Sequence, residues 1–340
     1  MRSTDLQPST LNLSKLEREF INNFQGNFPL QERPFLSIAE QLDCSEDELI
    51  ATVKKLKSEK ILTRFGPLYD AAELGGGLTL AAISVPQERY EIVTELVNTY
   101  PEVAHNYRRE HELNMWFVLA TETPVELLQV ISSIEKTTGL TVYNFPKQQE
   151  FYIGLWLHLS ADGKNTTIPV PDQTDEKIGD GYRLDGTDRK LVSVSQTGLS
   201  IESEPYKKLA HDIDISQDEV LQRLKRLLSF GIIRRIGAVP NHYKLGFTAN
   251  GMTVWDVEDD KVTELGNIIG QLDFVSHCYQ RPRHLPMWRY NMFAMVHGAD
   301  KDEVNEKVKQ IEALLGKNCA QHETLFSSAI LKKTGLRLAA

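Results

Sequence analysis

Two stretches of this 340-residue chain, SEDELIATVKKLKSEKILTRFG at residues 45–66 and SQDEVLQRLKRLLSFGIIRRIG at residues 216–237, decide how it folds. Each opens with a serine followed three positions later by a glutamate, the pattern of a helix capping box. Each closes on a short apolar and basic run that ends in glycine. A capped helix followed by such a strand is typical of a winged helix-turn-helix. The motif is present twice.

The similarity between the two stretches extends along the chain and indicates a tandem duplication. Residues 25–75 align without gaps on residues 196–246, an offset of 171, with 15 identical pairs in 51 positions. Further on, residues 103–109 align on residues 275–281. The identical pairs gather at helix caps, at glycines and in one polar motif, which indicates that one structural unit was copied.

The first part of each copy is predicted to be helical. Residues 13–24 carry apolar side chains at helical spacing, residues 34–42 suggest a second helix, and the capping boxes pair Ser45 with Glu48 and Ser216 with Glu219. Wing strands are predicted at residues 61–66 and 232–237.

The second part of each copy alternates strand and helix in the order βαββαβ, the ferredoxin-like arrangement. In the first copy the predicted elements are 78–85, 88–99, 102–108, 114–121, 124–136 and 140–145; in the second they are 247–255, 261–270, 274–280, 291–297, 301–315 and 320–326. The predicted fold class is therefore α+β, a tandem duplication of a winged helix-turn-helix followed by a ferredoxin-like domain. Helices should cover one face of each sheet and leave the other free to meet a second sheet or a ligand.

The expected domain boundaries follow from the repeat and from one stretch rich in Pro, Gly and polar residues that shows no helical or strand period. They are residues 1–70 and 184–241 for the winged helix-turn-helix units, 71–160 and 242–340 for the ferredoxin-like domains, and 161–183 for the linker.

Composition excludes several classes of protein. A net charge of −9 argues against a surface that binds polyphosphate throughout, and three cysteines without a C-x-x-C pair predict neither a disulfide framework nor a zinc site. The N-terminus lacks the pattern of a signal peptide, and no apolar run is long enough to span a membrane. We therefore expect a cytoplasmic protein that does not contact membranes.

The most distinctive motif is H-x-Y-x-R, which occurs as His105-Asn-Tyr107-Arg-Arg109 and again as His277-Cys-Tyr279-Gln-Arg281. In an extended strand, side chains two positions apart point to the same face. An imidazole, a phenol and a guanidinium should thus line one surface in both copies. An unpaired arginine is costly to bury, so this surface should be the one that helices leave free. The alternative, a surface strand with incidental polar residues, is made less probable by the repetition.

Further arginines, aromatic residues and asparagines flank both motifs, and they suit a flat ligand that carries carboxylates and iron. Arginine binds carboxylates with a charged fork, aromatic rings provide flat walls, and histidine binds iron or transfers protons. The candidate substrate-binding residues are Arg108, Arg109, Arg281, Arg283, Asn114, Trp116, Trp288 and Asn291. His297, which follows an apolar strand, is interpreted as a strand-end residue.

A winged helix followed by a βαββαβ domain resembles the Lrp/AsnC family of transcription regulators, and the resemblance covers each copy almost fully. A DNA-binding helix of this type presents its N-terminal residues to the major groove. Here those residues are Ser45-Glu-Asp-Glu48 and Ser216-Gln-Asp-Glu219, whose acidic side chains repel phosphate. DNA is therefore not expected to be a partner.

Two longer stretches resemble the signatures of siroheme decarboxylases. They are His105-Asn-Tyr-Arg-Arg-Glu110 followed by Asn114-Met-Trp-Phe-Val118, and Ser276-His-Cys-Tyr279 followed by Arg281-Pro and Tyr290-Asn-Met-Phe-Ala-Met295. The resemblance spans nearly the whole chain. The two halves differ in one respect, because the loop between Arg281 and Asn291 is longer than the one between Arg109 and Asn114.

The resemblance implies a carboxy-lyase that removes CO2 from the C12 and C18 acetates of siroheme to give 12,18-didecarboxysiroheme, for haem d1 or the alternative haem route. We expect His105 and His277 to donate protons, or one of them to be an axial ligand of the substrate iron, and Tyr107 and Tyr279 to orient them or relay protons. The only metal expected is the iron that siroheme carries, and no further cofactor is expected.

Two other functions stay open at this point, a haem- or tetrapyrrole-sensing protein without catalysis and an amino-acid-responsive regulator. Also left open are a homodimer through the ferredoxin-like sheets and contacts with other haem-pathway enzymes.

Overall fold

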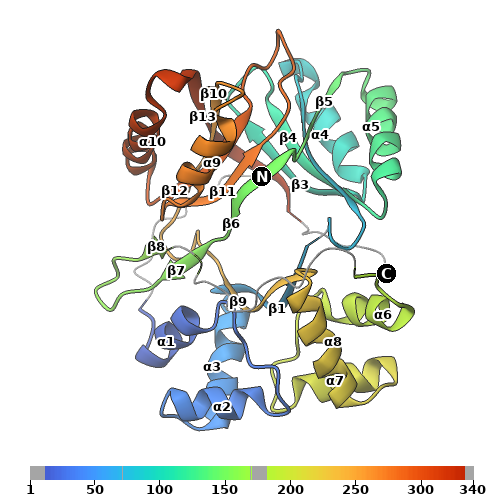
Figure 1. The fold of residues 1–340 in the computed structure, drawn as a ribbon, viewed down its shortest axis with the longest axis vertical. Helices are drawn as coiled ribbons and strands as arrows, with labels where there is room; N and C mark the ends of the chain where they lie inside the picture. The colour runs from blue at the N-terminus through green and yellow to red at the C-terminus, as the bar shows by residue number, and fades with distance from the viewer. Residues whose placement is uncertain (1–11, 71, 169, 171–181, 334–340) are drawn as a thin grey trace.

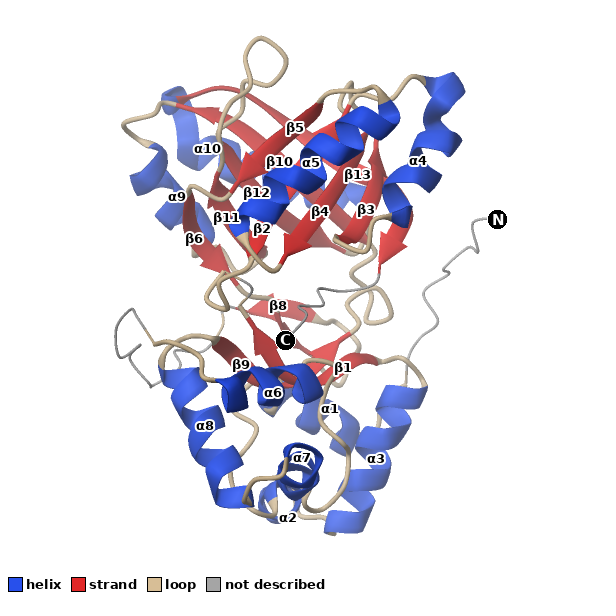
Figure 2. Cartoon of the chain, turned by 90° about the vertical axis from the view of Figure 1, so that its right-hand side faces the viewer, coloured by secondary structure: helices blue, strands red, loops and turns tan. Residues whose placement is uncertain are grey.

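The computed structural model describes residues 12–70, 72–168, 170 and 182–333 of the chain. The chain forms a helical body and a sheet body, one above the other (Figures 1 and 2). Both copies of the repeat contribute to both bodies, so the duplication visible in the sequence does not divide the molecule into a first-half lobe and a second-half lobe. The predicted fold class is confirmed.

The helical body contains the two helix-turn-helix units. Its helices are α1 (Lys15–Asn23), α2 (Pro34–Gln41) and α3 (Glu46–Ser58) from the first copy and α6 (Gly186–Ser195), α7 (Pro205–Ile213) and α8 (Gln217–Ser229) from the second. Ser45 and Ser216 cap α3 and α8, each hydroxyl accepting a hydrogen bond from the backbone N–H three residues on. The two-way capping box is found instead at α1 and α6, where Ser14 pairs with Glu17 and Asp185 with Asp188.

The two predicted wing strands pair with each other. β1 (Leu62–Tyr69) and β9 (Ile233–Pro240) run antiparallel, with Gly66 opposite Gly237. A Cβ atom on Gly66 would lie 2.7 Å from the backbone N of Leu199, and one on Gly237 would lie 2.5 Å from the backbone O of Phe24. These close backbone approaches explain why glycine stands at this position in both copies. One hydrophobic core runs through both helix-turn-helix units.

The sheet body is built on a sheet of nine strands, counted over the residues that the structure describes, in the order β5-β2-β4-β3-β13-β10-β12-β11-β6. The strands are β2 (Gly77–Ile83), β3 (Val103–Arg109), β4 (Met115–Thr121), β5 (Val142–Pro146), β6 (Gln149–Ile153), β10 (Ala249–Val257), β11 (Val275–Gln280), β12 (Met292–Gly298) and β13 (Cys319–Lys333).

Two of these strands cross between the copies. The second copy's β13 is longer than predicted: its first part pairs with β10 and its second part, from Ser327 to Lys333, pairs with β3 of the first copy. In return, β6 of the first copy pairs with β11 of the second. The predicted domain of residues 71–160 therefore contributes its last sheet strand to the other copy. This exchange joins the two ferredoxin-like units into one sheet.

The sheet folds over so that its two halves face each other, with helices outside (Figure 2). Helices α4 (Tyr90–Thr99) and α5 (Pro124–Thr138), with the short 3-10 turn Gln87–Arg89, cover the first half; α9 (Val262–Gly270) and α10 (Lys301–Leu315), with the turn Gly316–Asn318, cover the second. A third apolar cluster fills the space between the two inner faces, where Trp116 and Phe145 meet Phe293.

The predicted linker, residues 161–183, contains more regular structure than expected. Its β8 (Thr166–Ile168) pairs with β7 (Trp156–His158) as a small two-stranded sheet. Residues 169 and 171–181 of the linker lie outside the described residues. Among the helices that the structure describes, none has both the length and the apolar composition to cross a membrane.

Candidate active site

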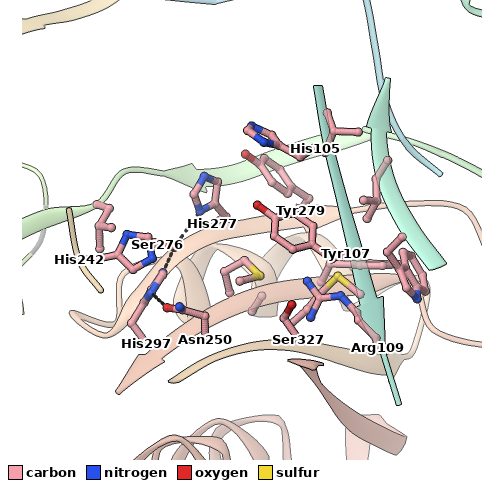
Figure 3. Close-up of a pocket in the computed structure, with 18 of the residues that line it drawn as sticks. His105, Tyr107, Arg109, His242, Asn250, Ser276, His277, Tyr279, His297 and Ser327 are labelled. Carbon is pink, nitrogen blue, oxygen red and sulfur yellow. Dashed lines mark hydrogen bonds between the residues drawn. The ribbon is translucent and has the colours of Figure 1, made fainter. Parts of the chain in front are cut away.

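A pocket of about 360 Å³ opens between the two inner sheet faces (Figure 3). Strands of both copies contribute to its wall, together with the loop that follows β9. The lining residues are Leu80, His105, Tyr107, Arg109, Trp116, Val118, Leu155, His242, Tyr243, Asn250, Met252, Ser276, His277, Tyr279, Arg281, Phe293, Ala294, Met295, His297, Ser327 and Lys333.

The two H-x-Y-x-R motifs meet in this single pocket. His105, Tyr107 and Arg109 reach it from β3, while His277, Tyr279 and Arg281 reach it from β11 and the residue after it. Alternation along the strands explains the shared direction. The residues between them point the other way: Asn106 donates to Asn98 of α4, and Cys278 packs among the apolar residues under the second copy's helices.

Both arginines of the motif are only partly hydrogen-bonded, with Arg109 buried and Arg281 half-buried. Arg109 donates to the backbone carbonyl of Leu325, and Arg281 donates to that of Phe145. The Nε atoms of both are buried and have no hydrogen-bond partner among the described residues. Burial lowers the pKa of each guanidinium to about 10, so both keep their charge at neutral pH. Each therefore offers a charged donor to an anion in the pocket.

His277 stands at the end of a hydrogen-bonded chain. Its Nδ1 lies 2.8 Å from the Ser276 hydroxyl, which lies 2.5 Å from Nε2 of His297, and His297 Nδ1 is bonded to the Asn250 side-chain oxygen (Figure 3). The ring of His242 lies 5.6 Å from that of His297 between centroids. Burial lowers the pKa of His277 and of His242 to about 4, and holds that of His297 well below its usual value.

His105 has a different environment although it occupies the equivalent position. Its Nδ1 is buried and lacks a hydrogen-bond partner among the residues described. Burial lowers its pKa, and the nearby charge of Lys333 lowers it further. The imidazole is therefore largely neutral at pH 7, with one ring nitrogen able to accept a proton or bind a metal ion.

The tyrosines of the motif and an apolar wall complete the pocket. Burial raises the pKa of Tyr107 and of Tyr279, so both phenols hold their protons at neutral pH. The guanidinium of Arg281 lies 5.0 Å from the Tyr279 ring centroid. Trp116, predicted as a ligand wall, lines the pocket and is fully buried, and Met252, Phe293 and other apolar side chains extend this surface.

Two arginines that the sequence analysis assigned to the ligand lie outside the pocket-lining residues. Arg108 points to the opposite side of β3, where its guanidinium donates to Gln87 and lies 4.4 Å from the Tyr90 ring centroid. Arg283 is held by Asp256 and Asp259. These two carboxylates neutralise the charge of Arg283, and the sequence alone did not predict this pairing.

The two asparagines and Trp288 also lie outside the pocket lining. Asn114 exchanges hydrogen bonds with the backbone of Val85, and Asn291 does the same with Val257, so each fastens the start of a strand. Trp288 is buried in the apolar cluster between the sheets, against Trp116 and Phe145. Trp288 thus packs directly behind Trp116, which does line the pocket.

Sequence reasoning missed the polar residues that surround His277. His297 is not simply the end of a strand, because its side chain faces the pocket two positions after Met295 on β12. Asn250 precedes Met252 by two positions on β10 in the same way. This alternation could have revealed both residues once the inner face was known. Tyr243 and His242 come from a loop and Lys333 from the crossing part of β13, for which the sequence offered no signal.

The fold and this site define a helix-turn-helix protein with two AsnC-like ligand-binding domains. The family model described as "AsnC-like ligand binding domain" matches residues 73–152 and 244–332, and the one described as "Siroheme decarboxylase NirDL-like HTH domain" matches residues 17–62 and 188–234. A siroheme decarboxylase of Hydrogenobacter thermophilus is 30% identical over 92% of both chains. The chain belongs to the siroheme decarboxylase family.

Two further comparisons extend this result. The siroheme decarboxylase NirH subunit of Pseudomonas aeruginosa is 55% identical over 44% of this chain and 88% of its own length. A crystal structure of the siroheme decarboxylase NirDL in complex with an iron-uroporphyrin III analogue superposes with a TM-score of 0.71 and 27% identity, covering 96% of this chain and 94% of that one. Family members thus include chains that correspond to the whole protein and chains of about half its length.

Proposed function

We propose that this chain removes CO2 from the C12 and C18 acetate side chains of siroheme and releases 12,18-didecarboxysiroheme. The observation that carries the proposal is the meeting of six motif side chains, three from each copy, in one pocket between the sheets. Two supporting facts are the full-length relative that is named a siroheme decarboxylase and the similar structure that holds an iron-uroporphyrin III analogue.

The pocket suits a flat macrocycle with acidic groups at its edge. Its apolar and aromatic wall matches the ring, while Arg109, Arg281 and Lys333 match the carboxylates. An adjoining hollow of about 490 Å³ shares Tyr243, Asn250 and Ser327 with the pocket, which extends the space for the side chains of the macrocycle. In the proposal, His105 or His277 binds the substrate iron, and the reaction needs no other cofactor.

Decarboxylation of a pyrrole acetate needs a place for the electron pair of the breaking C–C bond. Protonation of the pyrrole ring provides it; the methylene carbon then takes a proton, the ring loses one, and the net change is one carboxylate and one proton converted into CO2 and a methyl group. His105 and His277 are the proposed proton donors or, where one of them binds the iron, the other is the donor; Tyr107 and Tyr279 orient them. The carboxylates of a bound substrate bring negative charge beside these rings, which favours the protonated imidazoles.

The arginines have a separate role in this scheme. A guanidinium bound to the reacting carboxylate would stabilise the charge that must disappear, and would slow the loss of CO2. Arg109 and Arg281 are therefore assigned to carboxylates that do not react. The reacting acetates are assigned to the apolar part of the wall away from these two guanidinium groups, where a carboxylate is poorly solvated.

The test is anaerobic incubation of the purified protein with siroheme, with CO2 measured and the product analysed by mass spectrometry. We expect loss of two CO2 per macrocycle. His105→Ala and His277→Ala should each lower the rate by about 10²- to 10⁴-fold while the far-UV circular dichroism stays unchanged. Siroheme that binds without losing CO2 would instead identify a tetrapyrrole sensor, and wild-type rates in both variants would end the assignment of the histidines.

Regulation through DNA is not favoured by the helical body. The N-termini of α3 and α8 carry acidic residues, and some of the cations later in these helices form ion pairs within the protein. Arg223 pairs with Asp185, Asp188 and Glu219. Lys55 pairs with Glu17.

The setting of the reaction is also a proposal. Cys44, Cys278 and Cys319 are all unpaired, which supports a reducing compartment such as the cytoplasm. The product would enter haem d1 synthesis or the alternative haem route. Other enzymes of the haem pathway are the proposed protein partners. A homodimer through the ferredoxin-like sheets would have to use sheet edges, because the inner faces of the two sheet halves already meet within one chain.

A further inference from the structure

We propose that Ser276 and His297 form a proton relay behind His277, with Asn250 fixing the orientation of His297, and that this relay exists only in the second copy. The inference rests on the proposed function, because it assigns a means of proton supply to the same pocket. It makes the two histidines of the repeated motif unequal: His277 exchanges protons through the protein, and His105 does not.

An irregularity in β11 makes the relay possible. In a regular strand the side chains of Ser276 and His277 would point to opposite faces. The pairing of β11 with β12 shifts register between Val275 and His277, as at a β-bulge. The Ser276 hydroxyl consequently reaches Nδ1 of His277 at 2.8 Å and Nε2 of His297 at 2.5 Å, and Figure 3 shows the three side chains in a row.

The hydrogen bonds define a path for one proton. The side-chain oxygen of Asn250 can only accept, so His297 Nδ1 keeps its proton toward Asn250 throughout. When His297 is an imidazolium, its Nε2–H donates to Ser276, and the serine donates to Nδ1 of His277, whose Nε2–H faces the substrate.

Proton transfer to the substrate then balances. The Nε2–H bond of His277 breaks as a C–H bond forms on the methylene carbon, the serine proton moves to His277 Nδ1, and the His297 Nε2 proton moves to the serine. His297 ends neutral, and the electron pair left by CO2 is used in the new C–H bond. The reverse path returns to His297 a proton that the pyrrole ring releases to His277.

The surroundings of His297 favour the neutral imidazole over the imidazolium. The imidazole is 5% exposed, and the groups that face it are His242 from the loop after β9, His277 from β11, and Lys307 from α10, whose amine donates to the His297 carbonyl at 2.8 Å. Among these groups there is no carboxylate to stabilise an imidazolium. A proton on His297 is therefore passed on readily.

The first copy has the same strands without the relay. Strand pairing places His277 opposite Met295 and His105 opposite Val118, so the position of His297 corresponds to Ala120. By the same pairing Asn250, opposite His297, corresponds to Leu78, opposite Ala120.

The serine position completes the comparison. Ser276 precedes His277 as Ala104 precedes His105. Methyl and isobutyl groups cannot carry a proton, and Nδ1 of His105 has no hydrogen-bond partner among the residues that the structure describes. The duplication has thus kept the motif in both copies and the relay in one.

The experiment replaces Ser276 by alanine, which gives the second copy the residue of the first, and by threonine, which keeps the hydroxyl. For Ser276→Ala we expect kcat for CO2 release to fall about 10- to 100-fold. The Kd for siroheme, from spectroscopic titration, should stay within about twofold because the Ser276 hydroxyl is engaged by His277 and His297 and carries no charge for the ligand's carboxylates. Ser276→Thr should recover most of the rate. Ser229→Ala, in α8 and far from the pocket, is the matched control and should behave as wild type.

A double-mutant cycle and a solvent isotope measurement exclude a purely structural effect. If the residues act as one path, Ser276→Ala combined with His297→Gln should be no slower than the slower single variant. Rates in mixtures of H2O and D2O should give a curved plot for the wild type and a straight one for Ser276→Ala.

Two results would overturn the relay. One is a wild-type kcat in Ser276→Ala, and the other is multiplied losses in the double variant. A wild-type protein that releases no CO2 would instead reject the proposed function itself, so the two failures can be told apart.

Discussion

Arg281 carries a positive charge that the described residues do not pair fully, and a bound anion would complete its hydrogen bonding. The side chain is half-buried, its Nε is buried without a hydrogen-bond partner among the described residues, and one NH group donates to the Phe145 carbonyl. Burying a charge without full pairing costs stability, so such an arrangement indicates a site that binds an anion.

Arg281→Ala should therefore weaken siroheme binding more than it slows the bound complex. Loss of a charge-assisted hydrogen bond of about 1.5–3 kcal/mol corresponds to an increase in Kd of about 10- to 100-fold. Arg283→Ala is the matched control, because that guanidinium is neutralised by Asp256 and Asp259 outside the pocket, and its Kd should stay at the wild-type value. Equal losses in the two variants would contradict the assignment.

The histidines of the pocket make stability depend on pH. The pKa values of His277 and His242 are lowered to about 4, so between about pH 4 and the ordinary value of 6.5 the unfolded chain binds more protons than the folded one. Stability then rises with pH in this window and falls as pH is lowered. The ligand-free protein should have a lower urea midpoint at pH 5 than at pH 7.

A pair of variants assigns this effect to the pocket. His242→Gln should reduce the difference between the two midpoints, whereas His211→Gln, at a side chain that is 91% exposed, should leave it unchanged. Midpoints that are equal at pH 5 and pH 7 in the wild type would show that these imidazoles do not titrate as described.

Among the elements, the two crossing strands decide the architecture, and they show the limit of prediction from sequence. The order βαββαβ and the capped helices followed from periodicity and capping residues. Periodicity does not say which strand is a neighbour, so the pairing of β6 with β11 and of β13 with β3 was not predictable. For the same reason Ser327 and Lys333, at the crossing part of β13, could not be assigned to the site.

One glycine on α9 tests how closely the crossing strand β6 is packed. A Cβ atom on Gly266 would lie 2.3 Å from the ring of Phe151, which is part of β6. Gly266→Ala should therefore lower the free energy of unfolding by about 1–3 kcal/mol, because the ring must move in a filled core. Gly186→Ala is the control within another helix, at a position with open space, and should be neutral or slightly stabilising. Equal thermal midpoints for both variants would contradict this packing.

At the scale of the whole molecule, the repeated motif predicted which chemical groups line the pocket. It did not predict how far the pocket extends or which other residues surround it. Strand alternation alone assigns the three side chains of each motif to one face of their own strand, but it does not reveal that the two faces meet in one pocket. The asymmetry between the copies could not be predicted either, because it depends on Ser276, His297 and Asn250, which lie on three different strands. Nor does the sequence reveal which aromatic rings fill the space between the sheets, where Trp288 lies.

The exchange of strands predicts that the two copies need each other. A chain divided between residues 170 and 182, with an affinity tag on the first piece only, should give both pieces in one purified complex that decarboxylates siroheme. Each piece expressed alone should aggregate or be inactive, because it leaves the edge of β3 or of β11 unpaired. Two pieces that purify separately, with either one active, would contradict the shared pocket.

The most direct test of a single shared pocket is to soak crystals of the protein with siroheme and to locate the iron from its anomalous scattering. We predict a single strong iron peak per chain, inside the pocket lined by His105 and His277 and within bonding distance of one of the two imidazoles. An iron peak outside that pocket, or two peaks that each lie beside only one copy, would contradict it.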